Sequence, residues 1–212
     1  MSDADSRMRD IMSRATVIPV YTPGSVEEAV KVAKTLARGG IEVIEVTLRN
    51  GIAMDALKAM IEVTPGIAIG AGTVVTTRQM ETVAAMGAAF AVSPGTTPSL
   101  ISASQHANLP YLPGIATASE LMQGMQFGLS CFKFFPAAQA GGPALLSAFS
   151  GPFSDAVFCP TGGITLKTAP DYLRLKNVLC VGGSWLTTPE RLAKSDWQGI
   201  EDAAKAINTL VY

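Results

Sequence analysis

A lysine stands in the middle of an apolar run, S-C-F-K-F-F-P, at residues 130–136. Such a run, closed by proline and small residues, is typical of a buried strand, whose side chains alternate between two faces. Lys133 then shares one face with Cys131 and Phe135. Burying an unpartnered ammonium is costly, and loss of its proton relieves the cost. A neutral amine in a dry pocket suits imine formation with a carbonyl substrate; a lysine that reaches water from a strand end is the alternative.

A carboxylate and a guanidinium share one face of another expected strand, residues 41–48. The apolar face of this strand should pack on helices, which leaves Glu45, Thr47 and Arg49 facing inward. Glu45 could then move protons, and Arg49 could hold a substrate carboxylate through two hydrogen bonds. A structural Glu45–Arg49 ion pair, four residues apart on one face, is the alternative.

Two glycine runs close two further expected strands. They read T-G-G at residues 161–163 and G-G-S at residues 182–184. Glycine lets the backbone approach an anion closely, and successive N–H groups form an anion-binding nest. The loops after strands 7 and 8 of a (β/α)₈ barrel commonly bind phosphate. The runs therefore favour a phosphate site, with tight turns that need glycine only for conformation as the alternative.

The elements that must position these groups alternate regularly between strand and helix. Such alternation predicts parallel strands joined by right-handed crossovers, and eight units in 200 to 250 residues fit a (β/α)₈ TIM barrel. We expect strands at 16–20, 41–48, 67–71, 89–92, 111–112, 130–136, 156–159 and 178–181. We expect helices at 7–14, 54–63, 77–86, 98–106, 119–128, 142–149, 168–175 and 198–210, and one between a Ser25 cap and Gly39.

We expect one barrel domain over residues 1–212, with residues 1–15 as an N-terminal helix or extension. The rival fold is an open doubly wound sheet, whose dinucleotide-binding form carries G-x-G-x-x-G after an early strand. The best match begins at Gly70 and Gly72, but Val75 occupies the third glycine position. The dinucleotide interpretation is therefore disfavoured.

Composition excludes several classes of function. The net charge is −1 and charged residues make up 16% of the chain, so the sequence offers no field for nucleic acid and no polybasic patch for a membrane. Residues 1–14 are too polar for a secretory signal, and no apolar run reaches the roughly 18 residues of a membrane span. Cys131, Cys159 and Cys180 suit reduced thiols in a cytoplasmic protein. His106, the single histidine, is expected to be structural, and no metal site is expected.

Six motifs taken together resemble the bacterial 2-keto-3-deoxy-6-phosphogluconate (KDPG) aldolases. They are E-V-T-L-R at 45–49, G-A-G-T at 70–73, S-P-G at 93–95, F-K-F-F-P-A at 132–137, F-C-P-T-G-G at 158–163 and G-G-S-W at 182–185. The resemblance runs from about residue 17 to residue 186. It implies a cofactor-independent class I aldolase on a (β/α)₈ barrel, usually a homotrimer. The family cleaves 2-dehydro-3-deoxy-6-phosphogluconate to pyruvate and D-glyceraldehyde 3-phosphate in the Entner–Doudoroff pathway, and many members also act on 4-hydroxy-2-oxoglutarate.

The resemblance also implies a role for each matching residue. Lys133 is expected to be the Schiff-base lysine and Glu45 the general acid/base. The substrate contacts expected are Arg49 and Thr73 for the pyruvate carboxylate region, Phe135 on the imine, Pro94 as a pocket wall, Thr161 beside the substrate chain, and Gly162, Gly163, Gly182, Gly183 and Ser184 for the phosphate.

Three positions depart from the family pattern without removing a catalytic group. Ala138 replaces a frequent acidic residue, Asn50 a common threonine and Thr96 a common leucine. The change at Ala138 affects the loop expected over the lysine, and with it the range of substrates that the site could accept. Two other functions stay open: an aldolase for the galactonate epimer, and a phosphate-binding barrel isomerase or synthase that uses Glu45 without an imine.

Overall fold

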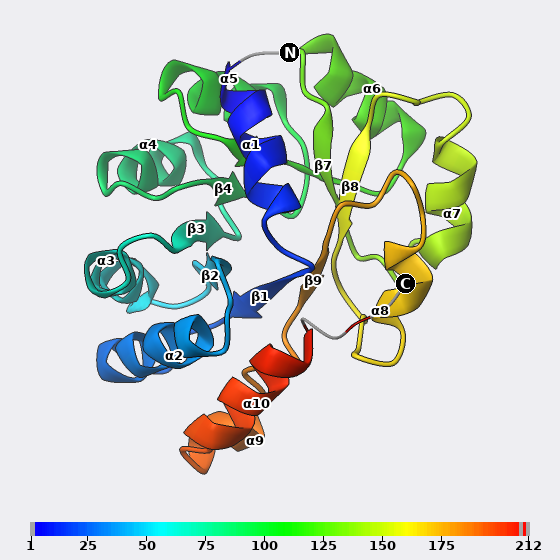
Figure 1. The fold of residues 1–212 in the computed structure, drawn as a ribbon. Helices are drawn as coiled ribbons and strands as arrows, with labels where there is room; N and C mark the ends of the chain where they lie inside the picture. The colour runs from blue at the N-terminus through cyan, green and yellow to red at the C-terminus, as the bar shows by residue number, and fades with distance from the viewer. Residues whose placement is uncertain (1–2, 208–209, 211–212) are drawn as a thin grey trace.

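The computed structural model describes residues 3–207 and residue 210. Short parallel strands form a ring, and the helices surround it (Figure 1). The strands are β1 (Val17–Tyr21), β2 (Val43–Thr47), β3 (Ala68–Gly72), β4 (Ala91–Val92), β5 (Tyr111–Leu112), β6 (Gly114–Ile115), β7 (Cys131–Phe134), β8 (Val157–Pro160) and β9 (Val181–Gly183).

The strand order closes a barrel. One run of paired strands reads β5-β4-β3-β2-β1-β9 and the other β6-β7-β8. Strands β5 and β6 follow each other directly across Pro113, and bridges from Phe158 to Val178 and from Thr161 to Gly182 join β8 to the β9 segment. These links make eight strand positions in the described chain, so the predicted TIM-barrel fold is confirmed.

The helices begin where the sequence provides caps. Ser25 accepts a hydrogen bond from the Glu28 N–H, and Thr76 and Thr117 each open a capping box. The helices are α1 (Asp3–Ser13), α2 (Val26–Arg38), α3 (Ala53–Val63), α4 (Thr77–Ala85), α5 (Pro98–His106), α6 (Ala118–Gln126), α7 (Gly142–Phe149), α8 (Ala169–Leu173), α9 (Pro189–Ala193) and α10 (Trp197–Ile207).

The structure differs from the expected elements in a few places. Strand β6 was not expected; Pro113 splits it from β5 because proline has no N–H to pair, although its carbonyl accepts from the Lys133 N–H at 2.9 Å. Strand β9 begins at Val181 rather than 178, since Val178 makes only an isolated bridge. Helix α9 was also missed. Helix α10 ends at Ile207, and residues 208–209 of the expected helix lie outside the described residues.

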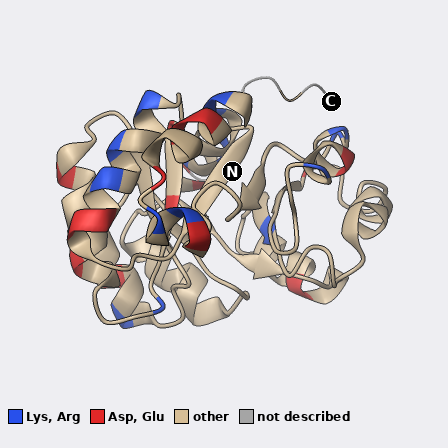
Figure 2. Ribbon diagram, turned by 90° about the horizontal axis from the view of Figure 1, so that it is seen from below, with Lys and Arg blue, Asp and Glu red and all other residues tan. Residues whose placement is uncertain are grey.

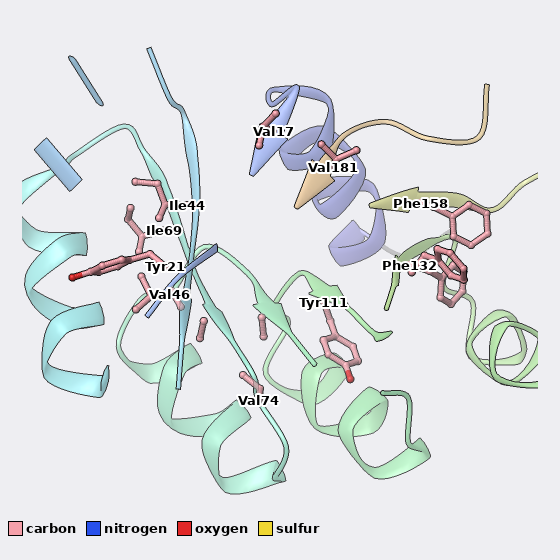
Figure 3. Packing of buried hydrophobic residues seen from close by; sticks show 14 of the residues in the cluster. Val17, Tyr21, Ile44, Val46, Ile69, Val74, Tyr111, Phe132, Phe158 and Val181 are labelled. Atoms are coloured by element: carbon pink, nitrogen blue, oxygen red, sulfur yellow. The ribbon is translucent and has the colours of Figure 1, made fainter. Parts of the chain in front are cut away.

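The core has two layers, as strand alternation predicts. Outward side chains such as Ile44 and Phe132 pack beneath the helices, and Figure 3 shows part of this layer. The barrel interior holds a second cluster that includes Val43 and Phe90. Met8 and Met12 of α1 belong to this inner cluster, so α1 fills one end of the barrel.

Helix α1 is tied to the strand that carries the lysine. Asp5, which is buried, accepts hydrogen bonds from the Ser130 backbone N–H at 2.9 Å and from the Ser130 hydroxyl at 2.7 Å. Ser130 immediately precedes β7. The helix therefore closes the end of the barrel at which the strands begin, which leaves their carboxyl ends for a site.

Charge is mixed over the outside of the molecule. Figure 2 shows Lys and Arg interspersed with Asp and Glu on the outer helices. Among the described residues, no helix is long and apolar enough to cross a membrane, and no cluster of three or more His, Cys, Asp or Glu could hold a metal ion. The His106 ring lies on the surface with Nδ1 2.7 Å from the Ser102 carbonyl, which fits the structural role expected for it.

The packing of α1 into one end of the barrel can be tested at its methionines. Met8 is fully buried, and Met8→Ala is expected to lower the free energy of unfolding by about 2–5 kcal/mol through lost burial and a residual cavity. Met122→Ala, at a side chain that is 52% exposed, is the matched control and should change it by less than about 0.5 kcal/mol. Denaturant unfolding followed by circular dichroism measures the free energy of unfolding of both variants. Equal decreases in the two variants would contradict the packing of α1 inside the end of the barrel.

Candidate active site

Lys133 and Glu45 meet inside the barrel. The Lys133 Nζ atom lies 3.1 Å from Glu45 Oε1 and 3.2 Å from Glu45 Oε2. Their side chains are only 6% and 5% exposed. Strand β7 supplies the lysine and β2 the carboxylate, and these strands are not neighbours in the sheet. The ion pair therefore spans the barrel interior. The inward direction predicted for Glu45 is confirmed, and the face of β7 that carries Lys133 is the inner one.

Phe135 covers the lysine from the end of β7. Its ring centroid lies 5.4 Å from Lys133 Nζ. The Phe135 N–H donates to the Ile115 carbonyl at 3.0 Å, which fixes this residue beside β6. An aromatic face at this distance attracts a cation and also presents an apolar wall to anything bound at the amine.

Cys131 is the other polarisable group on the inner face of β7. Burial raises the pKa of the Cys131 thiol to about 12, with the nearby Asp5 carboxylate adding to the shift. The thiol is therefore protonated at neutral pH, and a thiol in that state is a poor nucleophile. This leaves the amine of Lys133 as the reactive group of the strand.

Arg49 pairs with Thr73 rather than with Glu45. Arg49 Nε donates to Thr73 Oγ1 at 3.2 Å, across the carboxyl ends of β2 and β3. Glu45 makes its ion pair with Lys133, so the Glu45–Arg49 pair considered from the sequence is not the arrangement found. Arg49 is exposed and lines the cavity at the carboxyl ends of the strands.

A cavity of about 260 Å³ brings the two glycine runs together. Gly162 and Gly163 adopt positive φ angles of 102° and 72°, which glycine tolerates at little cost. Phe135 and Arg49 also face this cavity, so it adjoins the lysine. Its lining is Val20, Thr22, Arg49, Phe135, Thr161, Gly162, Gly163, Ile164, Gly182, Gly183 and Ser184.

The cavity lining includes one residue that the sequence interpretation missed and lacks one that it expected. Thr22 was not expected; its hydroxyl lies 2.7 Å from that of Thr47, and its place just after β1 was the available signal. Pro94, expected as a pocket wall, is not among the described residues that line the cavity. It lies in the loop after β4, where its carbonyl group occupies the space that a Cβ atom on Gly114 would need.

Each of the three residues that depart from the family pattern makes a hydrogen bond to a loop near the site. The Ala138 N–H donates to the Gly162 carbonyl at 3.1 Å, so this loop holds the first glycine run through its backbone. Asn50 Nδ2 donates to the Pro23 carbonyl at 2.8 Å, and Thr96 Oγ1 donates to the Gly114 carbonyl at 2.6 Å. Ala138 through its backbone, and Asn50 and Thr96 through their side chains, therefore support loops around the site.

Comparison with known proteins agrees with this geometry. The model of the "KDPG and KHG aldolase" family matches residues 8–203. The KHG/KDPG aldolase of Escherichia coli K12 is 45% identical over 205 residues, which cover 97% of this chain and 96% of that protein.

Two solved structures extend the comparison. The KDPG aldolase of Legionella pneumophila, with pyruvate captured at low pH as a covalent carbinolamine intermediate, is 46% identical with a TM-score of 0.92, over 94% of this chain and 97% of that one. The aldolase of Zymomonas mobilis ZM4 with 3-phosphoglycerate is 40% identical with a TM-score of 0.90, over 94% of each chain. The chain therefore belongs to the KDPG and KHG aldolase family.

Proposed function

We propose that this protein is a class I aldolase that cleaves 2-dehydro-3-deoxy-6-phosphogluconate to pyruvate and D-glyceraldehyde 3-phosphate. The observation that carries the proposal is the buried Lys133–Glu45 pair beside a cavity lined by two glycine runs. An amine and a carboxylate in contact can form an imine and move its protons. The covalent carbinolamine in the Legionella pneumophila relative supports the same chemistry.

The proposed reaction begins at Lys133. Glu45 accepts a proton from the ammonium, and the freed lone pair of Nζ forms a bond to the C2 carbonyl carbon of the substrate. The carbonyl electrons pass to oxygen, which takes the extra proton of the attacking nitrogen to give a neutral carbinolamine. Glu45 then protonates this hydroxyl, and water leaves to give the iminium ion. With Nζ 3.1 Å from the carboxylate, the first of these transfers lies within hydrogen-bond reach.

Cleavage and release use the same carboxylate. Glu45 removes the proton of the C4 hydroxyl, the C4 oxygen becomes the aldehyde oxygen, and the C3–C4 bond breaks. Its electron pair passes to the iminium nitrogen, which gives a neutral enamine. Glu45 returns the proton to C3, and water hydrolyses the resulting imine to pyruvate and free Lys133.

The surrounding residues take the binding roles in this proposal. Arg49 and Thr73 bind the substrate carboxylate, Phe135 packs on the imine and Pro94 shapes the approach from β4. Thr161 lies beside the substrate chain. The phosphate contacts are the backbone and hydroxyl groups of Gly162, Gly163, Gly182, Gly183 and Ser184. The 3-phosphoglycerate in the Zymomonas mobilis relative supports a site for a phosphorylated acid.

A second substrate follows from the same site. The Escherichia coli relative is a KHG/KDPG aldolase, so we propose that this protein also cleaves 4-hydroxy-2-oxoglutarate. That substrate needs the lysine and the carboxylate but not the phosphate contacts. Assaying pyruvate release from the gluconate substrate and from its galactonate epimer tests the assignment, because faster release from the epimer would contradict it.

We further infer that the chain acts as a single-domain homotrimer in the cytoplasm. The N-terminal helix packs inside the barrel, which supports one folding unit. Three free, buried cysteines suit a reducing compartment. The trimer is inferred from the family resemblance, and sedimentation equilibrium tests it against the 22.1 kDa mass of one chain.

Lys133 is expected to form the covalent intermediate. Borohydride reduction in the presence of pyruvate should fix a stable adduct, because only an imine is reduced in this way, and peptide mass spectrometry should locate it on Lys133. Lys133→Ala should form none, whereas Lys176→Ala, at a surface lysine, should react like the wild type. An adduct on Lys167 or Lys176 would contradict the assignment of Lys133, and the absence of any adduct would favour an enzyme that works without an imine.

Ser184 is expected to distinguish phosphorylated from unphosphorylated substrate. A hydrogen bond to an ionised group contributes about 1.5–3 kcal/mol, so Ser184→Ala should lower kcat/KM for the phosphorylated substrate roughly 10- to 150-fold. The value for 4-hydroxy-2-oxoglutarate should change little. Ser99→Ala, on an exposed side chain of α5, is the control. Equal losses on both substrates would argue against a phosphate contact at Ser184.

Glu45 is expected to carry the proton of the enamine. In heavy water, the wild-type enzyme should exchange the methyl protons of pyruvate as imine and enamine interconvert, and proton NMR measures the rate. Glu45→Gln should slow this exchange by about 10²–10⁴ while the fold is kept, since that is the usual contribution of a general acid/base. Glu62→Gln, at an exposed carboxylate of α3, is the control. Exchange at the wild-type rate in Glu45→Gln would assign the transfer to another group.

A further inference from the structure

Gly72, the last residue of β3, lies directly beneath the Glu45 carboxyl group. A Cβ atom placed on Gly72 would overlap Glu45 Oε1 and would come within 2.6 Å of Glu45 Cγ and 2.7 Å of Glu45 Cδ. The whole end of the Glu45 side chain thus occupies the space that any other residue at position 72 would fill. Because Gly72 does not have a positive φ, its backbone conformation does not itself require glycine.

The backbone beneath Glu45 has little freedom to yield. Gly72 is in register with Thr47 of β2, and the Leu48 N–H donates to the Gly72 carbonyl at 2.8 Å. A methyl group at position 72 would therefore move the carboxylate rather than the strand. Glu45 is buried, with Lys133 on one side and Gly72 on another, so its displacement would open the ion pair.

We propose that Gly72 is a positioning residue that keeps the Glu45 carboxyl group within reach of the reacting carbon, an inference that rests on the proposed function. While Lys133 is an ammonium ion, charge attraction helps to hold Glu45. At the enamine stage the nitrogen is neutral and Glu45 carries the proton, so this attraction lapses. Because Gly72 has no side chain, the carboxyl group can stay in the space over it during the step in which it must protonate carbon.

Gly70 provides a matched comparison on the same strand and the same inward face. A Cβ atom there would overlap the Phe90 ring, and the three nearest atoms that it would meet all belong to that ring. Gly70→Ala therefore adds the same methyl group two residues away, at the register partner of Glu45, and its closest contacts are with Phe90 of the inner core. Its cost should appear in the melting temperature, whereas the cost of Gly72→Ala should appear in proton transfer.

The experiment measures pyruvate exchange in heavy water for each folded variant. Gly72→Ala should slow exchange on the order of 10²-fold, as expected for a catalytic group misplaced by about 1 Å, and should still give the Lys133 adduct after long incubation with borohydride. Gly70→Ala should exchange near the wild-type rate. Gly72→Ala combined with Glu45→Gln should be no slower than Glu45→Gln alone, because two changes that act through one group are not additive.

Two outcomes would overturn the proposal: wild-type exchange in Gly72→Ala, or a further loss when Gly72→Ala is added to Glu45→Gln. If Gly72→Ala does not fold, the Glu45→Ala/Gly72→Ala variant, which lacks the Cγ and Cδ atoms that the added methyl would overlap, should fold, and its failure to do so would also contradict the idea. A crystal structure of the folded Gly72→Ala variant separates this proposal from the aldolase function. Gly72→Ala should place the Glu45 oxygens more than about 4 Å from Lys133 Nζ, beyond ion-pair distance, whether or not the wild type proves to form an imine.

Discussion

The rest of the barrel must support a buried ion pair between Lys133 and Glu45. Taking two charges out of water costs several kcal/mol for each, and their attraction offsets this only in good geometry. Here the ammonium contacts both carboxylate oxygens, and the Phe135 ring lies against it. A core built for stability alone would be better served by apolar side chains, so the pair is best understood as a requirement of chemistry that the fold must support.

The two ends of the barrel support the pair in different ways. At the end where the strands begin, Met8 and Met12 of α1 complete an apolar layer that excludes water from below. At the other end, glycine runs expose backbone groups around a small cavity next to Phe135. The dry layer keeps the amine and carboxylate in contact, while the open end gives access to the cavity from solvent. Strand direction separates the two environments, because every strand in the barrel points the same way.

Local rules in the sequence were enough to predict much of this arrangement. Alternation along β2 and β7 predicted that Glu45 and Lys133 face inward, and the glycine runs predicted the lining of the cavity. The contact between the two charges was beyond such rules, since the residues lie 88 positions apart on strands that do not pair. The break at Pro113 and the role of the Thr22 hydroxyl were missed for a related reason. Each depends on a residue of a neighbouring strand in the closed barrel, Lys133 for Pro113 and Thr47 for Thr22.

Gly72 illustrates the limit most clearly. In sequence, G-A-G-T invites comparison with phosphate-binding loops, because glycine near a strand end usually signals backbone approach to a ligand. In the structure, the inward glycine leaves space for a side chain from the neighbouring strand. The same relation recurs at Gly182, where a Cβ atom would overlap the Thr161 hydroxyl. In both places, a polar side chain inside the narrow barrel occupies space that is free because the adjacent strand carries a glycine. The glycine beside Glu45 therefore determines the geometry of the reactive pair together with the two charges.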